Sequence, residues 1–391
     1  QLGRDLPLYK FAVRDGAGTE VYVSPYVGDV RLVTTTKTRT LAWIATIPHW
    51  FYITPLRTNQ PLWYWIVVAT SALGCLLALL GLVLGVTQFH KSTPFRWSSV
   101  VRYQGLMRWH YISGAFFGIF ALTWVFSGLL SMEPFDWANA DGLTIRGDAL
   151  TGGPVELEQF PPFTADAWSA LLAGRTLKEL EFRRIADAPY YLARYTETGT
   201  EMGTDLFSEE NGSGPGSAPE NRSVPISEPR RERLHQPYPI TGRAEPRHML
   251  VDARTLTART EPFPADTLLE RLRAAAPDAS IVTHELLADY DSYYYSRNGQ
   301  AALPVLRVKF DDPLETWVYV DPELGQIVAS IHRLHRVERW LYNGLHSLDF
   351  GFWYDRRPLW DIGMILLSLG ALATSTIGFW LGWKRLRRGL A

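Results

Sequence analysis

Three long apolar stretches stand out in the hydrophobic pattern of the chain, at Trp63–Val86, Tyr111–Met132 and Leu359–Trp383. A helix needs about 20 predominantly apolar residues to cross a bilayer, and each stretch is long enough. None of them contains Lys or Arg, and their only acidic residue is Asp361, near the start of the third. Most tryptophans cluster at the ends of these stretches, as is typical of membrane interfaces. The pattern therefore predicts three membrane-spanning helices.

Before the first span, and between the second and third, the pattern alternates with the period of half-buried strands. It predicts strands within residues 8–33 and an α+β region over 133–335. Residues 208–245 are rich in Gly, Pro, Ser, Glu and Arg, which predicts a disordered insertion. The other expected elements are helices at Thr164–Arg175 and Asp266–Ala276, and strands at Leu177–Ile185, Tyr190–Tyr195, His248–Asp252, Ser280–Leu287, Pro304–Phe310, Thr316–Val320 and Gly325–Ile331.

The segments that precede the first and third spans are two copies of one pattern. Without a gap, the first copy falls on the second at an offset of 297 positions: Arg39 on Arg336, Trp43 on Trp340, His49 on His346, and Pro61-Leu62-Trp63 on Pro358-Leu359-Trp360. Such a register indicates an internal duplication. Because the second half of the chain has a span on each side of its outer domain, we expect a further outer-domain portion and a fourth span upstream of Gln1.

Basic residues predict which side of the membrane each segment occupies. The loop after the first span carries Lys91, Arg96, Arg102 and Arg108, and the tail after the third span is also basic. Positive-inside bias places both on the cytoplasmic side. The segments that contain the two repeated histidines, and the region from 133 to about 345, then lie outside the cytoplasm.

The expected fold class is an α-helical membrane protein with an α+β outer region. The formal net charge of -1 gives no general attraction to nucleic acid. The single cysteine, Cys75, excludes an internal disulfide framework and a c-type haem attachment motif. The predicted parts are 1–38 (tail of a first outer region), 39–90 (lead-in helix and first span), 91–109 (cytoplasmic loop), 110–132 (second span), 133–335 (outer α+β units) and 336–391 (lead-in helix, third span and basic tail).

Two histidines, His49 and His346, occupy equivalent positions of the repeat, just ahead of a span. Two homologous halves related by an axis along the membrane normal would bring them together on the outer side. A planar macrocycle between them would receive one imidazole on each face, and haem iron accepts such axial ligands. The alternative is an interfacial pair held by hydrogen bonds, because histidine in or beside a membrane is costly unless it is paired or liganded.

A third candidate, His110, opens the second span, with Gly114 and Gly118 on the same helix face. The glycines would leave room for a flat porphyrin, although a small-residue helix contact uses the same pattern. By the duplication, the partner of His110 would be a histidine on the expected upstream helix, and His90 is the substitute within this chain. A heptad seam of small residues along the first and third spans favours helix packing, with clearance for a cofactor as the alternative. Its members are Ser71, Gly74, Ala78, Gly81 and Gly85 in the first span and the equivalent Ser368, Ala371, Ser375, Gly378 and Gly382 in the third.

The remaining histidines carry weaker hypotheses. His332 and His335 form an H-x-x-H pair that would share one face of a helix. Their positions in the first copy hold threonines, so the symmetry argument does not extend to a ligand role for them. His235, His248 and His284 stand singly in the outer region, which is typical of solvated surface residues.

Several segments resemble the PepSY-associated transmembrane family. Residues 47–57 (IPHWFYITPLR), 109–132 (WHYISGAFFGIFALTWVFSGLLSM), and 344–350 (GLHSLDF) with 356–361 (RRPLWD) are similar to its helix-flanking segments, and the hairpin that ends in VDPELGQIV resembles a PepSY domain. The family has four helices, in agreement with the expected further span. Some members are ferrisiderophore reductases of the bacterial inner membrane that hold two b-type haems. The resemblance implies that His49, His110 and His346 are haem ligands.

These observations favour a transmembrane electron-transfer protein with haem b, two of them in the full-length protein. Electrons are expected to enter near His110, pass to the His49–His346 pair and reduce a periplasmic ferric chelate, such as a ferrisiderophore, for iron uptake. No nicotinamide-binding glycine motif is present, so a cytoplasmic protein or a quinol is the expected donor. Tyr293-Tyr294-Tyr295 is a candidate chelate contact, with an aromatic strand edge as its alternative. The rival function is a membrane-anchored PepSY protein that binds a periplasmic peptide or peptidase without redox chemistry.

Overall fold

The computed structural model describes residues 7–26, 28–89, 101, 103–137, 142–162, 164–197, 247–296 and 301–389. The predicted insertion 208–245, His90 and most of the loop between the first two spans lie outside these residues. The chain divides into two compact units. One contains the described residues up to Phe135 and from Leu341 onward, and the other contains those from Asp136 to Trp340.

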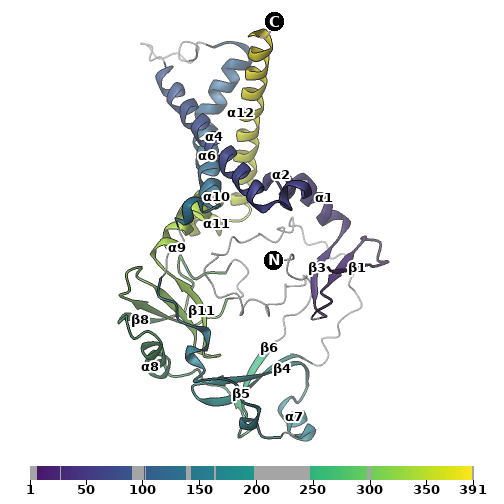
Figure 1. The fold of residues 1–391 in the computed structure, drawn as a ribbon, viewed down its shortest axis with the longest axis vertical. Helices are drawn as coiled ribbons and strands as arrows, with labels where there is room; N and C mark the ends of the chain where they lie inside the picture. The colour runs from purple at the N-terminus through teal and green to yellow at the C-terminus, as the bar shows by residue number, and fades with distance from the viewer. Residues whose placement is uncertain are drawn as a thin grey trace. The chain divides into compact units, whose positions relative to one another are not determined.

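Three helices of the first unit are long and apolar enough to cross a membrane: α4 (Gln60–Thr87), α6 (Gly105–Leu130) and α12 (Leu359–Gly389). They confirm the three predicted apolar helices. The central helix, α6, packs against both α4 and α12 (Figure 1). The α4 helix begins where the Asn59 side chain accepts a hydrogen bond from the Leu62 amide, with proline in the first turn, which needs no backbone donor there.

Before α4, the first unit forms a small antiparallel sheet and a run of short helices (Figure 1). The sheet has the order β1 (Tyr9–Ala12), β2 (Glu20–Val23), β3 (Val30–Thr34). The helices are α1 (Thr36–Ile44), α2 (Thr46–His49) and α3 (Thr54–Arg57). The predicted lead-in is therefore broken into three pieces. One break is at Phe51, whose φ of 51° is left-handed and ends any helix.

A similar run of short helices leads into α12. It consists of α9 (Arg333–Glu338), a π-helical turn at Arg339–Gly344, α10 (Leu345–Ser347) and α11 (Gly351–Tyr354). The left-handed residue is Leu348, with a φ of 49°, at the position equivalent to Phe51. Both lead-ins thus bend at the same place, two residues beyond their histidine. This shared bend sets the orientation of each histidine-bearing turn with respect to the span that follows it.

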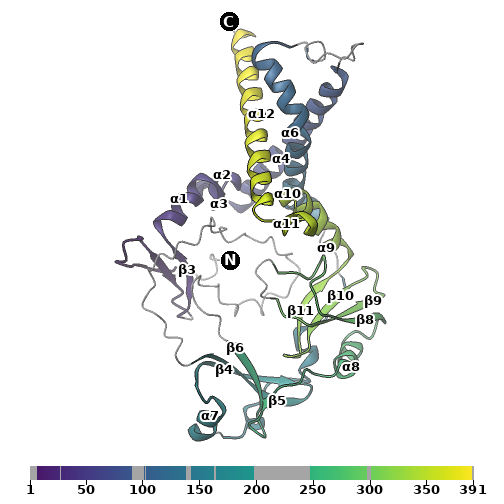
Figure 2. The same cartoon turned by 180° about the vertical axis from the view of Figure 1, so that it is seen from behind.

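The second unit contains two antiparallel sheets, each accompanied by a helix (Figure 2). Three fully buried leucines of α8, Leu268, Leu269 and Leu272, form the main core together with Val308 and Val318 of the second sheet. Every strand predicted for this region is confirmed to within about two residues. The first sheet lies near α7 (Ala165–Leu171) and has the strand order β4 (Arg175–Ile185), β5 (Ala188–Glu197), β6 (Arg247–Asp252), β7 (Ala258–Arg259). The second sheet lies near α8 (Ala265–Ala275) and has the strand order β11 (Gln326–Ile331), β10 (Trp317–Asp321), β9 (Val305–Phe310), β8 (Ile281–Leu287).

The internal repeat is present in the structure as well as in the sequence. Strands β1, β2 and β3 are equivalent to β9, β10 and β11, with the same pairing order. A bulge falls between Tyr22 and Val23 in the first copy and between Tyr319 and Val320 in the second, at the same repeat position. Each strand pair then closes through a left-handed glycine, Gly28 with a φ of 71° or Gly325 with a φ of 56°. The two copies of the repeat thus share the same strand pairing, including the bulge and the left-handed glycine.

Two side-chain contacts recur at equivalent positions in the two copies. A repeated arginine donates to the carbonyl of a left-handed residue, Arg39 to Gly18 at 2.9 Å and Arg336 to Glu315 at 2.8 Å. A repeated indole N–H donates to the turn that follows its histidine, from Trp63 to the Trp50 carbonyl at 2.9 Å and from Trp360 to the Ser347 carbonyl at 3.2 Å. Because an unpaired buried donor is costly, the tryptophan bond ties each histidine-bearing turn to its span.

Candidate functional site

The structure brings the two repeated histidines together within the first unit. His49 ends α2, His346 lies in α10, and their ring centroids are 5.8 Å apart with an interplanar angle of 66°. The meeting of these rings is what the symmetry of the repeat predicts. Neither lies inside a long helix, so their positions depend on the short turns held by Trp63 and Trp360.

The spacing of the two rings fits one metal centre between them. Two imidazoles on opposite sides of one ion have ring centres roughly 6 Å apart, because each metal–nitrogen bond is about 2.0–2.1 Å long. Among the described residues, no group of three or more His, Cys, Asp or Glu side chains could hold an ion. A site with two protein ligands suits an iron whose other four ligands come from a porphyrin ring. The donor set therefore fits haem better than a bare cation.

The orientation of His346 is set by a buried serine on α6. Ser127, which is fully buried, lies with its Oγ 3.0 Å from His346 Nδ1 and donates its own proton to the Trp124 carbonyl, also at 3.0 Å. The hydroxyl has only that one proton, so it accepts from Nδ1–H, and Nε2 carries the lone pair. A donated Nδ1–H is the usual outer partner of a metal-binding histidine. In the sequence, only its place in the second span distinguishes Ser127.

Aromatic and glycine neighbours complete the surroundings of the pair. Tyr342 stacks on His346 with centroids 5.2 Å apart, and Trp50 meets His49 edge-on at 6.0 Å. Gly128 of α6 lies against His346, so that a Cβ there would be 3.9 Å from Cε1. Desolvation by neighbouring protein atoms lowers the pKa of His49, although the residue as a whole is exposed. The lowered pKa favours the neutral imidazole, which is the form that binds metal.

The third candidate histidine, His110, has a comparable arrangement inside the helix bundle. Its Nδ1 lies 3.2 Å from the Thr374 carbonyl on α12. A carbonyl can only accept, so Nδ1 carries the proton and Nε2 the lone pair. The ring lies over Gly378, where an added Cβ would be 2.8 Å from Cε1. In the sequence Gly378 belongs to the small-residue seam, and in the structure it contacts the His110 ring.

The two glycines predicted to clear space beside His110 contact neighbouring helices instead. A Cβ at Gly114 would lie 3.9 Å from Thr374 of α12, and one at Gly118 would lie 2.9 Å from Leu82 of α4. These are the contacts expected of the small-residue packing alternative. A cofactor role for the glycines stays a prediction, and so does the pairing of His110 with His90, which lies outside the described residues.

His332 and His335 contact each other, and together they stabilise the start of α9. Their rings stack with centroids 3.5 Å apart, and His332 Nδ1 accepts from the His335 amide at 3.3 Å, which caps the start of α9. Burial is the main cause that lowers both pKa values, that of His335 to about 4. Arg336 lowers the pKa of His332 further, and Asp312 opposes that effect.

Acid should therefore weaken the second unit through this pair. Because the pKa of folded His335 is about 4 and the unfolded value is 6.5, the unfolded chain binds more protons between these values. Stability should be constant above pH 6.5 and fall by up to about 3 kcal/mol as the pH drops toward 4. Urea unfolding at a series of pH values would measure it. A His335→Phe variant should lose most of this pH dependence, and an unchanged slope in that variant would contradict the assignment.

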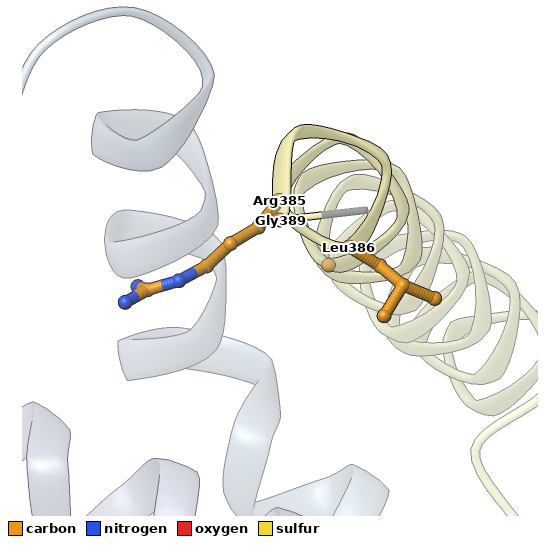
Figure 3. A pocket seen from close by; sticks show the side chains of 4 residues that line it. Arg385, Leu386 and Gly389 are labelled. Atoms are coloured by element: carbon orange, nitrogen blue, oxygen red, sulfur yellow. The ribbon is translucent and has the colours of Figure 1, made fainter. Parts of the chain in front are cut away.

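A separate shallow hollow lies at the C-terminal end of α12, lined by Gly382, Arg385, Leu386 and Gly389 (Figure 3). Its lining contains no histidine. No family model matches the chain, and the searches of characterised proteins and of solved structures also find no match. The function is therefore argued from the geometry around His49, His346 and His110.

Proposed function

We propose that the protein is a haem-binding membrane protein that passes single electrons to a ferric chelate outside the cytoplasm. The observation that carries the proposal is the His49–His346 pair, with ring centroids 5.8 Å apart and with Ser127 orienting His346. The resemblance to PepSY-associated transmembrane proteins supports the same function. In this proposal the bilayer surrounds α4, α6 and α12, and the second unit lies in the periplasm of a bacterial inner membrane.

When bound, haem supplies one-electron redox chemistry, and the residues of the chain hold and orient it. His49 and His346 would hold one haem on the outer side, and His110 would help to hold an inner one. The reaction transfers one electron from a quinol or cytoplasmic donor and converts Fe(III) in the chelate to Fe(II). Oxygen-donor chelates hold Fe(II) less tightly than Fe(III), because the charge of the ion is lower.

The absorption spectrum of the purified protein in detergent tests the proposal. A Soret band that shifts when dithionite is added is the expected result. A colourless protein, purified from cells supplied with iron and a haem precursor, would refute the redox function. That result would leave the three apolar helices as anchors only.

Replacing Ser127 should loosen haem without abolishing its binding. A Ser127→Ala variant removes the acceptor of His346 Nδ1–H, and loss of such an outer partner typically costs 10–100-fold in metal affinity. Transfer of haem to an excess of a scavenging protein would measure the change as a faster dissociation rate. The Ser127→Thr variant keeps the hydroxyl and should behave as the wild type. Equal rates in all three proteins would show that Ser127 does not orient the ligand.

One observation favours the rival function of peptide binding. Strand β8 is an edge of its sheet, and Val282 and Leu286 on it are 61% and 59% exposed. Edge strands with exposed apolar side chains can accept an added strand from a partner. A protein without a Soret band that nevertheless bound extended peptides, and lost them in a Val282→Lys variant, would establish this function instead.

A further inference from the structure

In the second unit, the sheet that contains β10 carries an unusual group of cations around one indole ring. Trp317 of β10 has the Lys309 Nζ 4.1 Å from its ring centroid, with the guanidinium carbons of Arg336 and Arg307 at 4.3 Å and 5.2 Å. A single cation–π contact stabilises by about 0.5–2 kcal/mol, but the three cations also repel one another. The arrangement therefore needs a reason beyond packing.

The first copy of the repeat shows what this position holds in the other sheet. Glu20 stands where the second copy has Trp317, and its carboxylate pairs with Lys10 at 2.9 Å and Arg39 at 3.5 Å. Those two cations are the equivalents of Arg307 and Arg336. The equivalent of Lys309 is Ala12, which has no charge. Relative to the first copy, the second has exchanged the neutralising carboxylate for an aromatic ring and has gained a cation.

Nearby carboxylates pair with the two arginines of this cluster but not with Lys309. Arg307 pairs with Glu285 at 2.6 Å and Asp291 at 2.7 Å. Arg336 pairs with Glu315 at 3.4 Å, which Arg333 also approaches at 3.8 Å. Among the ion pairs of the described residues, none involves Lys309. Burial is the main cause that lowers the pKa of Lys309; Arg307 lowers it further, and Glu285 opposes that effect.

Aromatic residues border the cations, and a carboxylate fixes their position. Tyr293 meets Trp317 edge-on at 5.4 Å, and its hydroxyl accepts from the Trp340 indole N–H at 3.2 Å. Asp291 holds the loop: its Oδ1 accepts from the Tyr293 amide at 2.8 Å, and its Oδ2 accepts from the Tyr319 hydroxyl at 2.9 Å. The tyrosines thus belong to an ordered loop and not to a strand edge. The site is built before any ligand arrives, which lowers the entropic cost of binding.

We propose that Lys309, Trp317 and Tyr293, next to the buried Arg336, form the docking site for an anionic, aromatic ferric chelate of the catecholate class. This inference rests on the proposed function and names its substrate class. The negative oxygens of the chelate replace the carboxylate that the first copy supplies through Glu20. Its aromatic rings meet the indole and phenol rings by stacking or edge contacts. A neutral hydroxamate chelate lacks both the charge and the rings, so the site discriminates against it.

A gallium complex tests the inference without electron transfer, because Ga(III) matches the charge of Fe(III) but is not reduced by a biological donor. Titration calorimetry of the full chain in detergent would use Ga(III) tris(2,3-dihydroxybenzoate) as the probe and a neutral Ga(III) trihydroxamate as the comparison. We expect saturable binding of the catecholate complex, weakened by salt, and at least tenfold weaker binding of the hydroxamate. No binding of the catecholate, or equal affinity for the two complexes, would overturn the assignment.

Three variants locate the site. Trp317→Glu restores the ion pairs of the first copy and should abolish measurable binding while the fold is kept, as Glu20 already shows that a carboxylate is accommodated. Lys309→Met should weaken binding about tenfold. Lys178→Met, on the exposed surface of β4, is the control and should bind as the wild type does. Unchanged affinity in the first two variants would place the chelate elsewhere.

The two proposals fail in different ways. A protein with a dithionite-sensitive Soret band that does not bind the gallium catecholate retains the proposed electron-transfer function and refutes only this docking site. A protein that binds the gallium complex but shows no haem band keeps the site and loses the redox function.

Discussion

Replacing His346 with alanine should remove the proposed outer haem, which roughly halves the haem content of a protein that binds two. The ring centroids of His346 and His49 are 5.8 Å apart, and alanine at position 346 would leave only His49 of the pair to hold that haem. The loss should not come from unfolding, because Ser127 still donates to the Trp124 carbonyl. A pyridine haemochrome assay of the purified variant measures the haem content per chain.

The matched variants decide whether the two histidines act as a pair. His49→Ala should give the same loss, and the double variant should lose no more than either single one, because both ligands serve one centre. His284→Ala, at an exposed position of β8 that stands alone, should keep the full content. Haem content that is unchanged in both single variants would refute the pairing.

Replacing Gly378 with valine should displace His110 and remove the haem that it is proposed to bind. A Cβ at position 378 would lie 2.8 Å from Cε1 of the His110 ring, so the ring must move and give up its 3.2 Å bond to the Thr374 carbonyl. The loss of one such hydrogen bond costs only about 0.5–1.5 kcal/mol, so the fold should persist. Redox-difference spectra would show the loss of one haem component, and the thermal midpoint in detergent would fall by a few degrees.

The repeat itself supplies the control for this experiment. Gly81 of α4 is equivalent to Gly378, and an added Cβ there would meet nothing within 4 Å. Gly81→Val should therefore leave the spectrum and the melting temperature as they are. If both valine variants behaved alike, the effect would come from helix propensity or lipid contact and not from His110.

The sequence alone was enough for the parts of the fold that depend on local pattern. A long apolar run predicts α4, α6 and α12, because a helix is the only single segment that satisfies its own backbone in a bilayer. Alternation and short apolar runs predicted β4 and β5 and the strands of the second sheet, although β5 and β10 are buried on both faces. The lead-ins to the first and third spans were the exceptions: a single helix was expected in each, and the left-handed residues Phe51 and Leu348 interrupt them.

Within the candidate site, only the contact between residues that the duplication repeats could be predicted from the sequence. The equal spacing of His49 and His346 before their spans predicts that they meet, because equivalent positions of two paired halves lie near the axis that relates them. The same reasoning identifies His110 only by its place at the start of a span. It says nothing of Ser127, because one serine in an apolar helix has many equivalents in the chain.

By itself, then, the sequence determined the three apolar helices, the strands and the register of the repeat, since each depends on periodicity within a few residues of chain. The tertiary structure decided which groups face one another: Ser127 with His346, Gly378 with His110, and three cations with Trp317. These contacts join residues far apart in the chain. These contacts form only when helices and strands pack against one another. Packing depends on the shapes of side chains and on the relative orientation of the elements, and local sequence periodicity specifies neither.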